Sequence, residues 1–321
     1  MSASSRARVG LVHGEDRRRS VYQALELVRQ DVVAKLQPQL LIKPNFLSTT
    51  NQLASSHADA VRGIIDFLKT VPNPPEEIVI AEGANNQKYS GEALDNFGYR
   101  ALVDESPIPI RLVDLHQESE WVETTIVLAD QSETVVKMPK LVLDIPCKLS
   151  LAVAKTHDVC VVTLALKNMI MGTLYKPDRI KMHGFHSHAE RTLPAEAQVL
   201  NINLIRVARY LWPDIAVIDG IQGLQGNGPG GTDAVDFKIA AASADVFAAD
   251  AVVAKAMGFE PLELGLLHYG NELGLGIADL ARIDVLQTPI ASVQTAFKPH
   301  DKTDLQLQWH APDPLRAYLT A

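Results

Sequence analysis

The sequence predicts an α/β protein with a mostly parallel sheet flanked by helices and an antiparallel insertion. Two observations predict this fold. Short apolar runs typical of strands alternate along most of the chain with longer segments whose apolar residues recur at helical spacing. In addition, 47% of the 321 residues are hydrophobic, which is enough to bury a large core. Strands that alternate with helices form mostly parallel sheets covered on both faces.

The expected strands are short, and several end at a polar residue or a proline. They lie at residues 8–13, 40–43, 78–81, 150–154, 215–218, 237–242 and 283–286. The expected helices lie at residues 20–36, 57–69, 89–97, 164–171, 195–212, 245–257 and 262–269. Ser20 would cap the first helix in a capping box, and Ser55 or Ser56 would cap the second. Gly98 and Gly258 would close two of the later helices.

The pattern changes between residues 111 and 148, where strand-like runs follow one another over short polar links without a long helix. These runs lie at residues 125–128, 134–137 and 141–143. We therefore expect an antiparallel insertion of residues 111–148. It separates an N-terminal α/β lobe, residues 1–110, from a C-terminal α/β lobe, residues 149–321. The alternative is one continuous domain.

Charge and composition argue against several classes of function. The formal net charge of −8 argues against a nucleic-acid coat and against binding to an anionic membrane surface, since both favour Lys/Arg patches. No apolar run reaches about 20 residues and the N-terminus has no apolar signal core, so we expect a cytoplasmic protein. The oligomeric state stays open. Cys147 and Cys160 supply neither a disulfide framework nor the roughly four thiolates of an iron–sulfur cluster.

Polar residues at the ends of the expected strands are the informative ones, because ligands of parallel sheets bind beyond the carboxyl ends of the strands. Lys155 and His157 leave a buried apolar strand together, and Lys167 interrupts the apolar stretch that follows. A buried cation requires an anion, which can be an acidic side chain, a phosphate or a carboxylate. We therefore expect an anion-binding site. A structural ion pair with Asp158 or Asp219 is the alternative.

Other strand ends carry further candidate ligand-binding residues. Lys43 and Asn45 follow the second expected strand, and Glu82 ends the third. His57 is expected at a helix N-terminus, where the helix dipole favours anions. Ordinary capping by Ser56 is the alternative there.

A histidine-rich segment and a glycine-rich segment complete the candidates. His183, His186 and His188 lie close enough in sequence to ligate a divalent metal if their loop folds back. Acid–base catalysis, contact with an anion and simple surface exposure are the alternatives. Residues 226–231 match GxGxxG, but no helix follows them, so they are not a dinucleotide fingerprint. Their glycines let backbone amides approach a ligand closely, and an irregular turn is the alternative.

Several of these motifs occur together in one family. They are IKPN (42–45), SSHADAVRGII (55–65), AEG (81–83), KTHDVCVVTLALKNMIMG (155–172), the acid of VIDG (Asp219), GNGPGG (226–231), SADVFAADAVVAKAMG (243–258) and ELGLG (272–276). On these residues the chain resembles the domain-of-unknown-function 362 family, from about residue 41 to residue 286. Many members carry cysteine-rich clusters and are described as iron–sulfur proteins, a property that the two cysteines of this chain do not match. The arrangement is also distantly similar to nickel-pincer lactate racemases, in which histidine and lysine engage a cofactor.

The leading hypothesis is a small-molecule enzyme that binds an anionic substrate or cofactor in a cleft lined by Lys, His and Asn. His157 would be the general acid–base catalyst, and Lys155 and Lys167 would be catalytic residues that hold the anionic group. The expected ligand-binding residues are Lys43, Asn45, His57, Glu82, Asn168, Asp219, Asn227 and Gly228. The alternative is a non-catalytic protein that binds a cofactor or a metal in the same cleft, without an iron–sulfur cluster.

Overall fold

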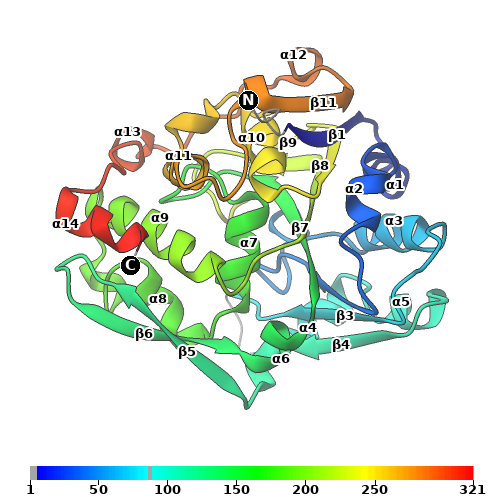
Figure 1. The fold of residues 1–321 in the computed structure, drawn as a ribbon, viewed down its shortest axis with the longest axis horizontal. Coiled ribbons are helices and arrows are strands. Elements are labelled where there is room, and N and C mark those ends of the chain that lie inside the picture. The colour runs from blue at the N-terminus through cyan, green and yellow to red at the C-terminus, as the bar shows by residue number, and fades with distance from the viewer. Residues whose placement is uncertain (1–5, 86–88, 321) are drawn as a thin grey trace, which may run out of the picture.

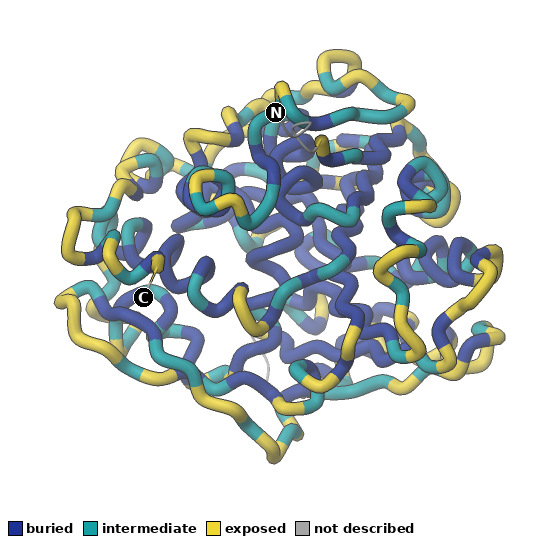
Figure 2. Tube along the Cα trace, in the orientation of Figure 1, coloured by how far each residue is buried: buried dark blue, intermediate teal, exposed yellow. Residues whose placement is uncertain are grey.

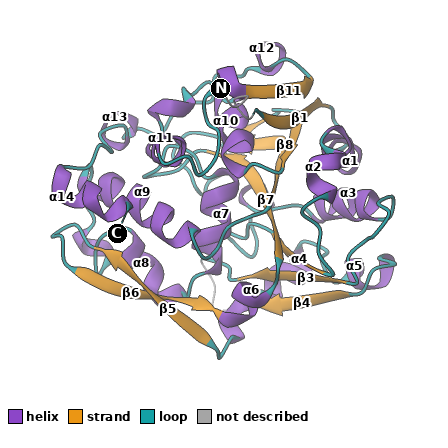
Figure 3. Ribbon diagram, in the orientation of Figure 1, coloured by secondary structure: helices purple, strands orange, loops and turns teal. Residues whose placement is uncertain are grey.

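The main sheet of the computed structural model has nine strands. It runs through the middle of the protein (Figure 1 and Figure 3). The structure describes residues 6–85 and 89–320. In spatial order the main strands are β11 (Ile283–Gln287), β1 (Ala7–His13), β10 (Ile239–Ser243), β8 (Ile215–Leu224), β7 (Cys147–Lys155), β2 (Gln39–Lys43), β3 (Glu77–Glu82) and β4 (Ile110–Asp114). The short β9 (Ala234–Val235) pairs with β8. Along this order only β10 runs against its neighbours, which confirms the mostly parallel sheet.

Two hydrophobic clusters lie on the two faces of the sheet, and helices cover both. Neighbouring residues of a strand alternate between the clusters, so Leu41 packs into one while Leu40 and Ile42 pack into the other. The larger cluster includes α7 (Leu164–Thr173), α9 (Ala195–Ala208), α10 (Val246–Ala256) and α11 (Gly265–Glu272). The smaller includes α1 (Arg17–Leu27), α2 (Arg29–Val33), α3 (Ala58–Leu68), α4 (Gly91–Asn96) and α5 (Ala101–Glu105). The buried trace in Figure 2 follows the sheet and these helices.

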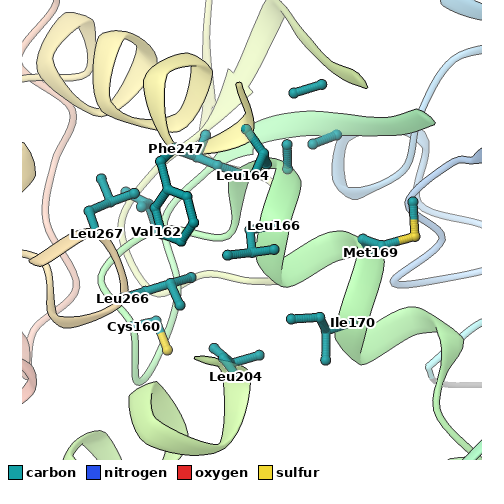
Figure 4. Packing of buried hydrophobic residues seen from close by; sticks show 14 of the residues in the cluster. Cys160, Val162, Leu164, Leu166, Met169, Ile170, Leu204, Phe247, Leu266 and Leu267 are labelled. Carbon is teal, nitrogen blue, oxygen red and sulfur yellow. The ribbon is translucent and has the colours of Figure 1, made fainter. Parts of the chain in front are cut away.

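Helix α7 lies inside the larger cluster and carries little exposed surface. Leu166 and Ile170 pack there with side chains of α9, α10 and α11 (Figure 4). The N-terminus of α7 is held by Asp250 of α10, whose two carboxylate oxygens accept the backbone N–H groups of Ala165 (2.7 Å) and Leu166 (3.1 Å). The carboxylate thereby satisfies two of the orphan donors at the start of a buried helix. This contact fixes α7 against α10.

The antiparallel part of the chain forms a separate hairpin of β5 (Trp121–Val127) and β6 (Glu133–Pro139). The prediction of a strand at residues 141–143 is wrong, because these residues lie in α6 (Lys140–Asp144), which begins directly after Pro139. Within this short helix Val142 is buried in the larger cluster while its neighbours are half-buried. β4, at the start of the expected insertion, is instead an edge strand of the main sheet.

Helix starts and breaks differ from the predictions at three places. α1 is capped by Asp16, whose carboxylate accepts the N–H of Arg19, while the expected cap Ser20 is buried inside the helix. The expected helix 20–36 breaks at Val28, whose φ of −112° and ψ of 24° are not helical, and continues as α2. α3 is capped by the imidazole of His57 rather than by a serine. Gly98 (φ 73°) and Gly258 (φ 94°) follow α4 and α10 in the left-handed conformation, as expected.

The remaining helices are short. They are α8 (Arg179–Met182), α12 (Ile290–Val293), α13 (Thr303–Gln306) and α14 (Asp313–Arg316). Across residues 6–85 and 89–320, no helix has the length and apolar character needed to cross a membrane.

The contact between Asp250 and the start of α7 gives a stability prediction. Asp250→Asn should lower the free energy of unfolding by about 1–3 kcal/mol, because the amide keeps one acceptor and turns its NH2 group toward the second backbone N–H. Burial raises the pKa of Asp250 to about 7, although both N–H groups lower it, so a rise in pH through this value costs stability that Asn does not lose. Urea unfolding should therefore be followed at pH 6, where the side chains of Asp250 and of its Asn replacement are both mostly uncharged in the folded protein. Asp16→Asn is the control, because Asn caps helices as well as Asp does. Equal loss in both variants would contradict the role of Asp250.

Candidate functional site

A cavity of about 660 Å³ lies at the carboxyl ends of β2, β3 and β7, beside α7. Residues that follow these strands line it, together with α7, side chains between positions 176 and 191, and Pro229 of the glycine-rich segment. This is the edge of a parallel sheet at which ligands generally bind. The structure brings eight of the predicted site residues to this cavity. They are Asn45, Glu82, Lys155, His157, Lys167, Asn168, His183 and His188.

Lys43 lies outside the lining but supports residues that belong to it. Its fully buried ammonium donates hydrogen bonds to Glu82 Oε1 (2.7 Å) and to Asn168 Oδ1 (3.2 Å). Glu82 Oε1 also accepts the backbone N–H of Phe46 (3.1 Å). Glycine at position 172 leaves room for this ion pair, because a Cβ there would collide with the ammonium of Lys43 and with Glu82 Oε1 unless the pair shifted. One buried ion pair therefore joins β2, β3 and α7 at the cavity.

Lys155 ends β7 and has no exposed surface. Its Nζ donates to Asn45 Oδ1 and to the backbone carbonyl of Ala54 (2.9 Å). These two acceptors match the two N–H groups of a neutral amine. Burial, reinforced by the nearby charge of Lys167 and only partly opposed by that of Glu82, lowers the pKa of Lys155 to about 7. Near neutral pH the amine therefore gains and loses a proton readily.

Lys167 carries a charge that the protein does not pair. Only 5% of this residue is exposed, and within the described part of the chain no carboxylate or hydrogen-bond acceptor contacts its ammonium. Burial lowers the pKa of Lys167, and this effect is opposed through space by Cys160 and by the acids Asp158 and Glu196. Both already bind Arg191, at 2.9 and 2.5 Å. The alternative considered from the sequence, an ion pair of Lys167 with Asp158 or Asp219, does not form, because Asp158 binds Arg191 and Asp219 binds Arg17. An unpaired buried cation is unfavourable for stability.

His157 is held in one tautomer by the backbone of the loop that follows β7. Its Nδ1 accepts the N–H groups of Val159 (3.0 Å) and Cys160 (3.4 Å), so the ring proton lies on Nε2. Asp158 Oδ1 lies 3.1 Å from the same nitrogen but forms no hydrogen bond with it. Burial and the charge of Lys167 lower the pKa of His157 well below its usual value. At neutral pH the side chain is therefore an uncharged hydrogen-bond donor.

Backbone strain and a distant side chain shape this loop. Val161 and Leu164 have positive φ angles of 64° and 49°, a conformation that is costly for such residues. The loop is closed by the hydrogen bond from the N–H of His157 to the carbonyl of Val161 (2.8 Å). Gln306, near the C-terminus, is buried and donates to the carbonyl of His157 (3.1 Å). Strained loops held from several sides are typical of functional sites.

Two arginines that line the cavity were missed in the sequence. Arg179 is buried and donates to the backbone carbonyls of Leu174 and Gly172, both at 3.1 Å. Burial lowers the pKa of Arg179 to about 10, which leaves it charged. Arg191 forms ion pairs with both Asp158 and Glu196. Their one signal in the sequence is a cation on each side of the histidine-rich segment.

Besides Lys43, four predicted ligand-binding residues lie outside the cavity lining. His57 Nδ1 caps α3 by accepting the N–H of Asp59. The buried Asp219 forms an ion pair with Arg17 (2.7 Å). Asn227 exchanges two hydrogen bonds with Asp301 (2.8 and 3.0 Å) and so ties the glycine-rich segment to the C-terminal part of the chain. At Gly228 a Cβ would collide with the backbone of Thr156, so this glycine allows a close approach of chain to chain.

The three histidines of the expected metal set are not gathered. His183 Nδ1 contacts Glu196 Oε1 and the ring lines the cavity. His188 also lines the cavity, whereas His186 is exposed and contacts Glu190 through its backbone N–H (3.1 Å). Among residues 6–85 and 89–320, no group of three or more His, Cys, Asp or Glu side chains could hold a metal ion. The prediction of a metal site made of these three residues is therefore corrected.

These features define an α/β protein with a cation-lined cavity at the carboxyl edge of its sheet. The chain belongs to the family described as Domain of unknown function (DUF362), whose model matches residues 40–255. The resemblance expected from the sequence motifs is thus confirmed.

Two known proteins are similar to parts of the chain. The Thylakoid-associated protein sll1697 of Synechocystis sp. (strain ATCC 27184 / PCC 6803 / Kazusa) is 28% identical over 140 residues. That match covers 44% of this chain and 41% of the cyanobacterial protein, so it spans less than half of that relative. The lactate racemase apoprotein from Thermoanaerobacterium thermosaccharolyticum aligns with a TM-score of 0.43 and 12% identity. This alignment covers 67% of this chain and 50% of the racemase chain.

Proposed function

We propose that this protein is an enzyme that binds a small anionic molecule in the cavity beside α7. The observation that carries the proposal is the buried, unpaired ammonium of Lys167. A protein gains no stability from such a charge, whereas an anionic ligand would pair with it and exclude water from it. The cavity volume of about 660 Å³ is suitable for a small molecule.

Catalysis rather than simple binding is supported by the groups beside Lys167. Lys155 has a pKa of about 7, which suits an acid–base catalyst at neutral pH. His157 presents a neutral Nε2–H donor, which suits the stabilisation of negative charge that develops on a substrate. In this proposal Lys167 holds the anion, Lys155 transfers the proton and His157 stabilises the reacting group. The proton-transfer role that the sequence suggested for His157 thus passes to Lys155.

Replacement of Lys167 tests whether its charge is reserved for a ligand. Lys167→Met should weaken binding of sulfate at least about tenfold, because a hydrogen bond to a charged group contributes about 1.5–3 kcal/mol. The same change should leave the unliganded protein equally stable or more stable, because it removes an unpaired buried charge. Isothermal titration calorimetry and thermal unfolding measure the two effects.

Two matched lysines serve as controls for that experiment. Lys148→Met changes a buried lysine at the opposite end of β7 and should leave sulfate binding unchanged. Lys43→Met breaks the ion pair with Glu82 and should cost about 3–5 kcal/mol of stability. The proposal would be rejected if Lys167→Met lost about 3–5 kcal/mol of stability, as Lys43→Met should, and left sulfate binding unchanged, as Lys148→Met should.

The titration of Lys155 predicts the pH dependence of anion binding. Its pKa is lowered to about 7, so the protonated form prevails below pH 7 and the neutral form above it. Affinity for sulfate, which keeps its charge over this range, should therefore fall several-fold as the pH rises from 6 to 8. Lys155→Gln keeps N–H donors for Asn45 and Ala54 without a titrating charge, so its sulfate affinity should be flat over the same range. An unchanged slope in this variant would assign the titration to another group.

Replacement of His157 separates an enzyme from a non-catalytic binder. In His157→Asn the amide oxygen can still accept the N–H of Val159, but the Nε2–H donor is gone. A soluble metabolite extract incubated with the wild-type protein should lose at least one anionic compound in molar excess over protein, as mass spectrometry measures. The variant should consume that compound at least about 100-fold more slowly, in the range typical of lost acid–base or oxyanion contacts. If the wild-type protein consumes none, the non-catalytic alternative is favoured.

A further inference from the structure

The cavity contains a second buried cation without an acidic partner, and its place relative to Lys167 bears on the kind of ligand. Arg179 uses two of its five N–H groups on the backbone carbonyls of Leu174 and Gly172. Within the described residues no carboxylate forms an ion pair with this guanidinium. Glu82 is the acid that acts on it through space; Glu82 Oε1 is bound to Lys43, and Oε2 is buried without a hydrogen-bond partner and forms no ion pair with Arg179.

The position of Arg179 is built into the fold around it. Gly83 leaves the space that the guanidinium fills, because a Cβ there would lie 2.7 Å from Nη2. The bonds to Gly172 and Leu174 hold the side chain at the C-terminal end of α7, where the helix dipole favours a cation. Because these bonds use neutral acceptors, the charge stays available on the side that lines the cavity.

Lys167 and Arg179 lie toward opposite ends of α7. Lys167 precedes Gly172, whose carbonyl Arg179 binds, by five residues, which corresponds to about 7–8 Å along a helix. Side chains on a helix lean toward its N-terminus, so the lysine stem adds to this separation. Their electrostatic neighbours differ as well, with Asp158 and Arg191 acting on Lys167 and Glu82 acting on Arg179. Because no charged neighbour is shared between them, the two cations occupy separate parts of the cavity wall.

We propose that the natural ligand carries two separated anionic groups, one bound by Lys167 and one by Arg179, with the reacting atoms between them. The chemical class is an elongated dianion, either a dicarboxylate or a carboxylate that bears a phosphate or phosphonate at its other end. Such a ligand would lie along α7 and pass Lys155 and Asn168, which also line the cavity. This inference rests on the proposed function, because it uses the same cavity and the same role of Lys167.

Calorimetry with a matched pair of acids tests this ligand class. Glutarate and pentanoate share a five-carbon chain but differ in one carboxylate, so glutarate should bind the wild-type protein at least tenfold more tightly. Arg179→Gln places an amide donor where Nε binds the carbonyl of Leu174 while removing the charge, and should reduce the affinity for glutarate to that for pentanoate. The same variant should bind sulfate as the wild-type protein does, because sulfate is expected at Lys167 and not at Arg179. 4-Phosphonobutyrate distinguishes the two members of the class: tighter binding than that of glutarate indicates a phosphate end, and equal or weaker binding a second carboxylate.

The outcomes separate this inference from the proposed function. Equal affinities for glutarate and pentanoate, together with sulfate binding that Lys167→Met abolishes, would overturn the two-anion ligand and leave the anion site intact. Absence of sulfate binding in the wild-type protein would instead overturn the proposed function. If Arg179→Gln does not fold, as judged by circular dichroism, the comparison of glutarate with pentanoate in the wild-type protein decides the question.

Discussion

The buried ion pair between Lys43 and Glu82 is the contact on which the candidate site depends. The two residues end neighbouring parallel strands, β2 and β3, and a lone charge at either position would be strongly unfavourable. The ammonium also binds Asn168, which sets α7 over the ends of these strands. Gly172 permits this close approach, because no side chain intervenes between the helix and the ion pair. The cavity beside α7 follows from this arrangement.

Helix α7 combines two requirements that normally conflict. One side of it is packed among the apolar side chains of α9, α10 and α11, and Asp250 satisfies its first backbone N–H groups. This packing offsets the unfavourable burial of Lys167, whose charge has no partner among the described residues. Proteins tolerate such strain and unpaired charge mainly at sites where a ligand or a reaction uses it. The loop before α7, with positive φ at Val161 and Leu164, has the same character.

Segments distant in the sequence support the loop that carries His157. Gln306 holds the carbonyl of His157, and Thr156 donates through its hydroxyl to the carbonyl of Gly226 (2.9 Å). The glycine-rich segment is in turn bound to the C-terminal region through Asn227. Gln306 lies outside residues 40–255, which the family model matches, so a region beyond the family core helps to position the site. The glycines that suggested a ligand-binding loop serve to pack one chain segment on another.

The sequence by itself determined the mostly parallel α/β fold and most of its elements. The signals for these elements are local: the spacing of apolar residues marks each helix or strand, and Gly98 and Gly258 each mark the end of one helix. It also singled out Lys155, His157 and Lys167, since polar residues at the end of a buried run stand out locally. The tertiary structure alone decided which charges are paired. Asp219 meets Arg17 instead of Lys167, and that choice depends on segments about two hundred residues apart. The position of the ring proton on His157 likewise depends on the folded loop. The charge of Arg179 is available to a ligand only because the strands and α7 assemble into a cavity.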